Sequence, residues 1–140
     1  MRLIIVQAGK VKDRHLAALR DDYVERFRAF GRLEVVEADP APGRALWPAA
    51  ARCKVLLDER GEQYTSVELS RRLDQWTMRH GCTAFAIGAA DGHDPATAAT
   101  ADARWSLSPL TLPHQLAHLI VAEQLYRAAS ILKGRAYHRE

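Results

Sequence analysis

The chain has 140 residues, of which 48% are hydrophobic, and a formal net charge of +3. This length suits one hydrophobic core, so we expect a single domain over residues 1–140. No apolar run is long enough to span a bilayer, and the first residues lack a full signal region, so we expect a cytoplasmic protein. Cys53 and Cys82 are far apart and fit no metal spacing, which indicates simple buried thiols in a reducing compartment.

Strand-forming runs alternate with helical patterns along the chain. The runs predict strands at residues 3–8, 33–38, 53–57, 83–87 and 104–108, with glutamates in the second run indicating a sheet edge. Helical spacing predicts helices over 12–30, from the Thr65–Glu68 capping box to His80-Gly81, over 96–103 and from Pro113 to Lys133. Prolines predict a loop over 39–48, followed by at most a short turn at 49–52. The alternation is typical of an α/β fold, a mostly parallel sheet with helices on both faces.

The predicted C-terminal helix is apolar almost all round, because its aliphatic residues from Leu116 to Leu132 do not fit one narrow stripe. A helix of this kind is buried on several sides. A chain of this length has little protein to spare for that, so we expect a second copy to cover one face. An ordinary core helix is the alternative. Glu123 and Arg127 are spaced for a helical ion pair, and Lys133-Gly134 for a helix stop.

The C-terminal part of the chain is locally basic. From residue 104 onward five basic residues stand against two acidic ones, so this segment accounts for the whole net charge of +3. The basic residues are Arg104, Arg127, Lys133, Arg135 and Arg139. Such an end suits a polyanion such as RNA, and a solvated basic tail is the alternative.

Three predicted strands end in polar or glycine-containing loops, at residues 57–61, 88–92 and 106–111. In parallel sheets, ligands bind beyond the carboxyl ends of the strands. If these strands are neighbours, the loops converge on one pocket, where Gly88 and Gly92 would let the backbone pass close to a ligand. A plain turn is the alternative for the two glycines.

Several catalytic motifs are absent from the sequence. It has no G-x-G-x-x-G after the first strand, no Walker A loop and no G-x-S-x-G elbow, which argues against dinucleotide, P-loop and serine-hydrolase sites. His114 and His118 share a helical face. However, Gln115 stands where a zincin needs glutamate and no third ligand is evident, so we expect no metal.

Three C-terminal stretches carry a specific resemblance: residues 105–114 (WSLSPLTLPH), 122–128 (AEQLYRA) and 137–140 (YHRE), with weaker agreement over the whole chain. They closely resemble the bacterial ribosomal large-subunit pseudouridine methyltransferase H family, within the SPOUT class of knotted methyltransferases. The resemblance implies a C-terminal trefoil knot, a homodimer and S-adenosylmethionine as methyl donor. It also implies methylation at N3 of a pseudouridine in the 23S ribosomal RNA of the ribosome.

The same resemblance implies roles for particular residues. Donor binding is implied for Leu57, Gly88 and the loop residues Leu107, Ser108, Pro109, Leu110, Thr111 and Leu112, which belong to the three loops described above. Tyr137, His138 and Arg139 are implied to work at the target base. The candidate RNA contacts are Arg127, Arg135 and Arg139, because guanidinium groups suit phosphates and base carbonyls.

Three departures from the family pattern stand out. Where the family has Gly-Gly-Pro-x-Gly, this chain has Gly88-Ala89-Ala90-Asp91-Gly92, and we expect the change to loosen or crowd the donor pocket. His118 stands where the family usually has arginine, which would weaken a phosphate contact at neutral pH. The segment 39–52 is shorter than in familiar members and has no predicted helix, which would affect RNA docking more than donor binding.

Methyl transfer from a sulfonium is an in-line displacement, so donor and acceptor must be held about 3 Å apart. His138 is the candidate base or orienter for the N3 proton, with a mobile tail histidine as the alternative. Tyr137 suits stacking on a base. Arg127 either reaches RNA or pairs with Glu123. Asp58 either contacts the donor's ribose or caps a turn.

A tail that works in a partner's pocket would make the active site composite across the dimer. Two other functions fit the sequence. One is a non-enzymatic RNA- or ribosome-binding protein that keeps the fold but has lost donor affinity at Ala89. The other is a methyltransferase that acts on a different RNA.

Overall fold

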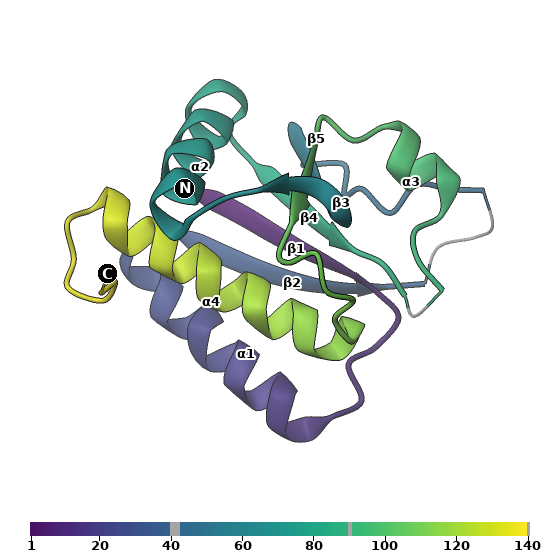
Figure 1. The fold of residues 1–140 in the computed structure, drawn as a ribbon, viewed down its shortest axis with the longest axis horizontal. Coiled ribbons are helices and arrows are strands. Elements are labelled where there is room, and N and C mark those ends of the chain that lie inside the picture. The colour runs from purple at the N-terminus through teal and green to yellow at the C-terminus, as the bar shows by residue number, and fades with distance from the viewer. Residues whose placement is uncertain (40–42, 90, 140) are drawn as a thin grey trace.

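The structure is a computed structural model that describes residues 1–39, 43–89 and 91–139. Its elements are β1 (Arg2–Ala8), α1 (Arg14–Arg26), a 3-10 turn η1 (Phe27–Ala29), β2 (Arg32–Ala38), β3 (Cys53–Gln63), α2 (Ser66–His80), β4 (Thr83–Ile87), α3 (Pro95–Ala99), β5 (Ala103–Ser106) and α4 (His114–Leu132). The strands form one sheet in the order β2-β1-β4-β3-β5, with parallel pairings throughout (Figure 1). The predicted α/β fold is confirmed, and β2 lies at an edge as expected.

The helices cover the two faces of the sheet unequally. α1, α2 and α4 lie over one face, with α4 between the other two (Figure 1). Leu3 and Phe85 point into this main core, while Ile4, one residue along β1, points to the opposite face and packs against Leu46. The five-residue α3 lies on that second side, where its Thr97 hydroxyl accepts a hydrogen bond from the Leu46 N–H.

α4 is buried largely by its own chain. Its central residues Val121, Ala122 and Leu125 have no exposed surface. The sheet, α1 and α2 therefore cover much of the apolar surface of α4 from which a second copy was predicted. Leu116 near the start of the helix stays 36% exposed, so apolar surface remains for a partner. The second copy stays a prediction.

β3 is longer than predicted and contains a bulge. It pairs with β5 first through Leu57 and then through Glu62, so residues 58–61 project from the ladder. Gly61 permits the bulge to approach β5 closely, because a Cβ at this position would lie 2.7 Å from the carbonyl carbon of Arg104. The prediction of a plain loop that ends the strand at residues 58–61 is wrong, since the chain continues in β3 to Gln63.

The helices lie close to their predicted positions, with small shifts at their ends. The Thr65–Glu68 capping box is present. Asp13 accepts the first N–H bonds of α1, so this helix begins two residues later than predicted. α3 stops at Ala99 because residue 103 already belongs to β5. Gly134, with φ of 65°, follows the end of α4 as the sequence predicted.

The segment after β2 forms only turns and irregular structure among its described residues. Pro40, Ala41 and Pro42 lie outside the described part of the chain. Cys53 is buried, and burial raises the pKa of its thiol to about 11, so it is an unreactive core group. Over the ranges that the structure describes, no helix combines the length and the apolarity that a membrane crossing needs.

Candidate functional site

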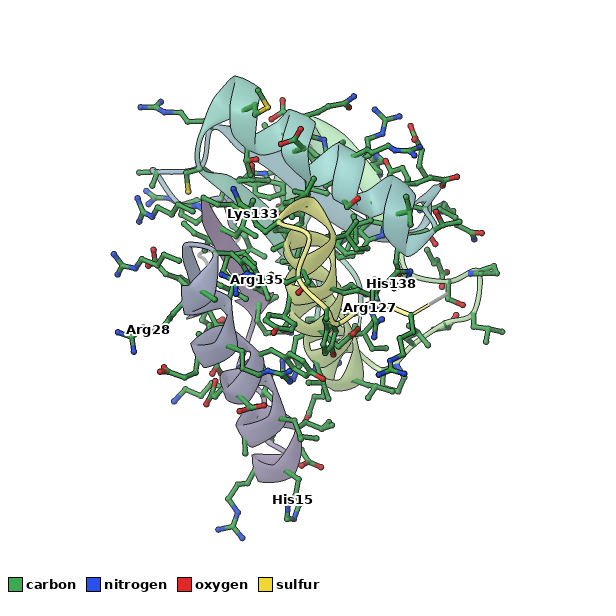
Figure 2. The ribbon with its side chains drawn as sticks, turned by 90° about the vertical axis from the view of Figure 1, so that its left-hand side faces the viewer. His15, Arg28, Arg127, Lys133, Arg135 and His138 are labelled. Carbon is green, nitrogen blue, oxygen red and sulfur yellow. The ribbon has the colours of Figure 1, made fainter. Side chains whose placement is uncertain are left out.

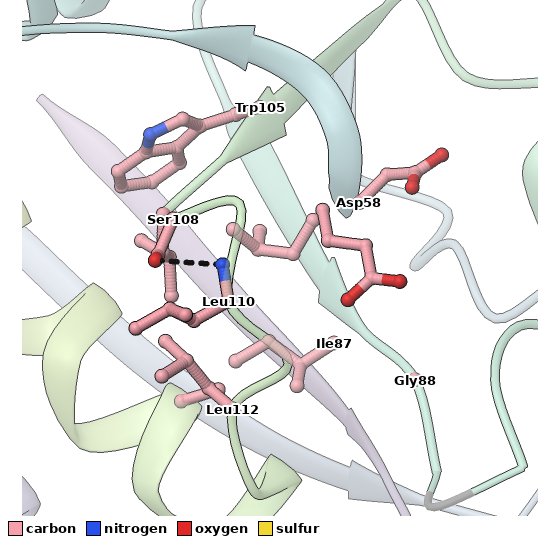
Figure 3. A pocket seen from close by; sticks show the side chains of 11 residues that line it. Asp58, Ile87, Gly88, Trp105, Ser108, Leu110 and Leu112 are labelled. Carbon is pink, nitrogen blue, oxygen red and sulfur yellow. Dashed lines mark hydrogen bonds between the residues drawn. The ribbon is translucent and has the colours of Figure 1, made fainter.

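A pocket lies where the β3 bulge, the carboxyl end of β4 and the loop after β5 meet the first turn of α4 (Figure 3). The predicted convergence of the three strand-end segments is therefore seen. Most of the lining side chains are apolar, and Leu110 leaves 70% of its surface exposed beside the pocket. The lining residues are Leu57, Asp58, Glu59, Ile87, Gly88, Trp105, Leu107, Ser108, Leu110, Leu112 and Ala117.

A wider and more polar groove adjoins this pocket. The two share the β3 bulge and Gly88. The groove adds charged and polar side chains, among them Arg60, Asp91, Arg104 and Thr111. The site thus has an apolar slot beside a polar recess, an arrangement that fits a ligand with one flat apolar part and one charged part.

Hydrogen bonds give the loop after β5 its shape. The Ser106 hydroxyl donates to the Ser108 carbonyl at 3.0 Å, and the Ser108 hydroxyl accepts from the Leu110 N–H at 3.0 Å (Figure 3). Thr111 then donates its hydroxyl to Glu59 on the β3 bulge at 2.9 Å. Of the predicted donor-binding residues, Thr111 lines the polar groove rather than the apolar pocket, and Pro109 is exposed and lines neither.

The turn after β4 is held close to β3. A Cβ at Gly88 would lie 2.9 Å from the carbonyl carbon of Gly92, so the tight turn requires glycine there. Just beyond, His93 Nε2 lies 2.7 Å from the Leu57 carbonyl oxygen, which makes this nitrogen the hydrogen-bond donor. His93 is not among the predicted site residues, although a histidine directly after a strand-end turn is a sequence signal for such a position.

Ala89 does not crowd the apolar pocket. It lines the polar groove and a further recess near β1, and it forms a bridge with Gly92. The expected crowding is therefore absent from the apolar slot. Ala90, the second departure in this turn, lies outside the described residues.

Asp58 caps the turn at the β3 bulge. Its carboxylate accepts the Arg60 N–H at 3.0 Å and pairs with Arg104 at 2.9 Å. These contacts, the Arg60 N–H bond first, hold the pKa of the Asp58 carboxyl below its ordinary value. Of the two roles predicted for Asp58, turn capping is present in the structure.

The tail does not lie at the pocket of its own chain. Residues 133–139 turn back beside α4, where the ring of Tyr137 packs against Tyr126 at 4.7 Å between centroids (Figure 1). None of the described tail residues lines the pocket or the groove. Figure 2 shows Arg127 and His138 side by side, with Arg135 along the same tail. Arg135 and Arg139 are exposed.

Arg127 makes the ion pair that the helical spacing predicted. Its Nη2 lies 2.7 Å from Glu123 Oε1, and both side chains are partly buried. The predicted alternative, a contact with RNA, stays a prediction.

His118 is fully buried between α1 and α4 and has no surface to offer a phosphate. The interpretation of this position as a weakened phosphate contact is wrong. Burial first, and then the charge of Arg20, lower the pKa of His118 to about 4. Neither ring nitrogen has a protein partner, so His118 is a neutral core residue. Within the described residues, no three histidine, cysteine or acidic side chains gather as metal ligands.

Comparison with known proteins covers nearly the whole chain. Residues 1–138 match the family described as "Predicted SPOUT methyltransferase". A protein from Sorangium cellulosum named "Ribosomal RNA large subunit methyltransferase H" is 39% identical, over 98% of this chain and 99% of its own length. Proteins of the same name from Deinococcus radiodurans and Thermus thermophilus are each 41% identical, over 99% of both chains.

Proposed function

Because this chain belongs to the SPOUT methyltransferase family, we propose that it transfers a methyl group from S-adenosylmethionine to 23S ribosomal RNA of the large subunit. The acceptor proposed is N3 of pseudouridine 1915 in this RNA, the target that the resemblance implies. The observation that carries the proposal is that the β3 bulge, the turn after β4 and the loop after β5 line one pocket. These are the segments for which the resemblance implies donor binding.

The chemistry of the pocket fits this donor. The apolar slot between Leu57, Leu107 and Leu112 suits the flat face of an adenine ring. Carboxylates of Asp58 and Glu59 stand where the slot opens to the polar groove, which suits a donor that carries positive charge on sulfur and on its amino group. When bound, S-adenosylmethionine supplies an electrophilic methyl group on its sulfonium.

The residues of the chain would bind, orient and shield the reactants. The loop from Leu107 to Leu112 covers the slot, and the bond between Thr111 and Glu59 ties this loop to the β3 bulge. Holding donor and acceptor in line supplies much of the catalysis that a displacement of this kind needs. We assign the target base to the tail, with His138 and Arg139 as its contacts and Tyr137 as the residue that anchors the tail. RNA phosphates are assigned to Arg127, Arg135 and Arg139.

A homodimer belongs to the same proposal. The tail packs on its own α4, away from its own pocket, so a second copy is needed to bring a tail and a pocket together. The exposed apolar surface of Leu116 near the start of α4 supports such a contact. We also propose that the C-terminal part forms a trefoil knot. The proposed location is the cytoplasm, where the protein would encounter assembled ribosomes.

The test combines donor binding with transfer. Calorimetry should show S-adenosylmethionine binding to the purified chain, and large subunits from a strain that lacks this modification should gain one methyl group at the target. Mass mapping of the rRNA locates the methyl group. No binding at millimolar donor would favour the non-enzymatic binding protein, and binding without transfer to 23S rRNA would favour another RNA as substrate.

A further inference from the structure

Tyr137 is held in a socket made by α1 and α4 of its own chain. Its ring packs edge-on against Tyr126, with an angle of 81° between the ring planes. Its hydroxyl lies 3.2 Å from Glu123 Oε1, to which it donates, and 3.2 Å from the Tyr23 hydroxyl. Since the single proton of Tyr137 goes to Glu123, Tyr23 is the donor of the second bond.

Two arginines close the socket. The guanidinium of Arg127 lies 4.8 Å from the centre of the Tyr137 ring, and that of Arg26 lies 5.3 Å from it and 4.7 Å from the Tyr126 ring. Cations over aromatic faces are favourable contacts, more so when partly shielded from water. Burial, aided by the bond with Tyr23 and by Glu123, raises the pKa of Tyr137, so its hydroxyl stays protonated. The tail tyrosine is therefore fixed by its ring and by its hydroxyl.

The socket also sets the chemistry of the next residue. Arg127 bonds Glu123 through Nε at 2.9 Å, and its Nη1 lies 3.1 Å from His138 Nδ1. A guanidinium has donors only, so His138 Nδ1 must be the acceptor and carry no proton. The ring is then neutral with its proton on Nε2, and Nε2 is a hydrogen-bond donor.

We propose that Tyr23, Glu123 and Arg127 are positioning residues that hold the tail so that His138 acts as a hydrogen-bond donor to the target base, not as the base that removes its proton. This inference rests on the proposed function. In the transfer, the N3–methyl bond forms, the bond from methyl carbon to sulfur breaks, and the N3 proton leaves to solvent water. Negative charge that develops on N3 spreads to the adjacent carbonyl oxygens, which the Nε2–H of His138 can stabilise.

Substitutions of His138 separate a donor from a base. Glutamine keeps an N–H donor and cannot take up a proton at neutral pH, whereas alanine removes both functions. We expect His138→Gln to stay within about tenfold of the wild-type kcat, and His138→Ala to lose about a hundredfold or more. Equal loss in the two variants would overturn the donor role.

Tyr23 tests positioning, because it lies on α1 and belongs to no assigned contact with donor or RNA. Tyr23→Phe removes one hydrogen bond to Tyr137 and should lower kcat about fivefold, with KM and donor affinity unchanged. Tyr64→Phe removes a tyrosine hydroxyl that bonds Glu62 and not the tail, and it serves as the matched control. The double variant Tyr23→Phe/Tyr137→Phe should be no slower than Tyr137→Phe alone, whereas multiplicative losses would contradict the socket.

Nitrogen-15 NMR of the histidine rings measures the tautomer of His138 and does not depend on enzyme activity. The wild-type chain should show His138 as the Nε2–H tautomer, assigned by loss of its signals in His138→Gln. A proton on Nδ1 would refute the inference even if the enzyme is active. If the wild type transfers no methyl group, the proposed function fails, and the tautomer still reports separately on the socket.

Discussion

The donor pocket and the tail socket are built by different means. The pocket is made of backbone segments, namely the β3 bulge and the turns that follow the parallel strands β4 and β5. Gly61 and Gly88 matter there because a Cβ would collide with backbone. The socket is made of long side chains from positions as distant as Tyr23 and Tyr137, joined by a hydrogen bond between residues 114 apart in sequence. The comparison indicates that the fold itself supplies the donor site, whereas reading the target base depends on side-chain chemistry that tertiary packing assembles.

Removing the tail should give the largest effect and leave the pocket intact. Deleting residues 137–140 should lower kcat by about a thousandfold or more. The deletion removes the contacts with the target base and also Tyr137, the residue that the socket holds. Donor affinity by calorimetry should stay within about twofold, since no described tail residue lines the pocket. The opposite variant, Leu110→Ser, should weaken donor binding while it leaves the His138 tautomer unchanged. Retained methylation after the deletion would refute the role of the tail.

Gly61→Ala should damage the pocket and spare the socket. Its Cβ would lie 2.7 Å from the Arg104 carbonyl carbon, so the β3 bulge must move and Glu59 with it. We expect a loss of about 1–3 kcal/mol in unfolding free energy, as for other overpacked sites, and weaker donor binding. Denaturant unfolding and calorimetry measure the two effects. Unchanged donor affinity would show that the bulge does not shape the pocket.

His118 lies in α4, the helix that joins the two regions. We therefore expect its protonation at acidic pH to lower the stability of both regions together. Its folded-state pKa of about 4 is below the ordinary 6.5, so the unfolded chain binds the proton more readily. Stability is unaffected above pH 6.5 and falls as the pH drops toward 4, by about 2 to 3 kcal/mol at pH 4.5.

Denaturant unfolding at pH 7 and pH 4.5 tests this for wild type and His118→Leu. The variant has no group to titrate at this position, so its loss of stability between the two pH values should be smaller by that amount. His15→Leu, at an exposed position on α1, is the control and should follow the wild type. Identical pH dependence in wild type and His118→Leu would contradict a depressed pKa.

The sequence predicted the pocket better than the socket for physical reasons. Strand runs such as residues 83–87 and the Thr65–Glu68 capping box are local signals, and parallel strands bring their carboxyl ends to one edge of a sheet whatever the loops contain. The β3 bulge was missed because Asp58 to Gly61 has the composition of a turn, and only the close approach of Arg104 shows what Gly61 does.

The contacts that form the socket could not be predicted, because no local sequence pattern indicates them. Tyr23 lies in the helix predicted over residues 12–30, and nothing in the spacing of that helix indicates a bond to a tail tyrosine. His118 could have been placed better, because it stands three residues before Val121 and seven before Leu125 on the buried side of α4. A polar residue on an apolar face is more often a buried group than a surface contact.

The smallest predicted effect concerns a single side-chain bond that joins two walls of the site. Thr111 donates to Glu59 across the gap between the loop after β5 and the β3 bulge. Thr111→Val removes the hydroxyl with little change of volume, so donor affinity should fall by about two- to tenfold, as expected for one exposed hydrogen bond of about 0.5–1.5 kcal/mol. Thr111→Ser keeps the hydroxyl and should bind like wild type in calorimetry. A loss as large as that of Leu110→Ser would mean that side-chain bonds, and not the backbone of the bulge and turns, hold the donor. That outcome would remove the contrast between the two regions.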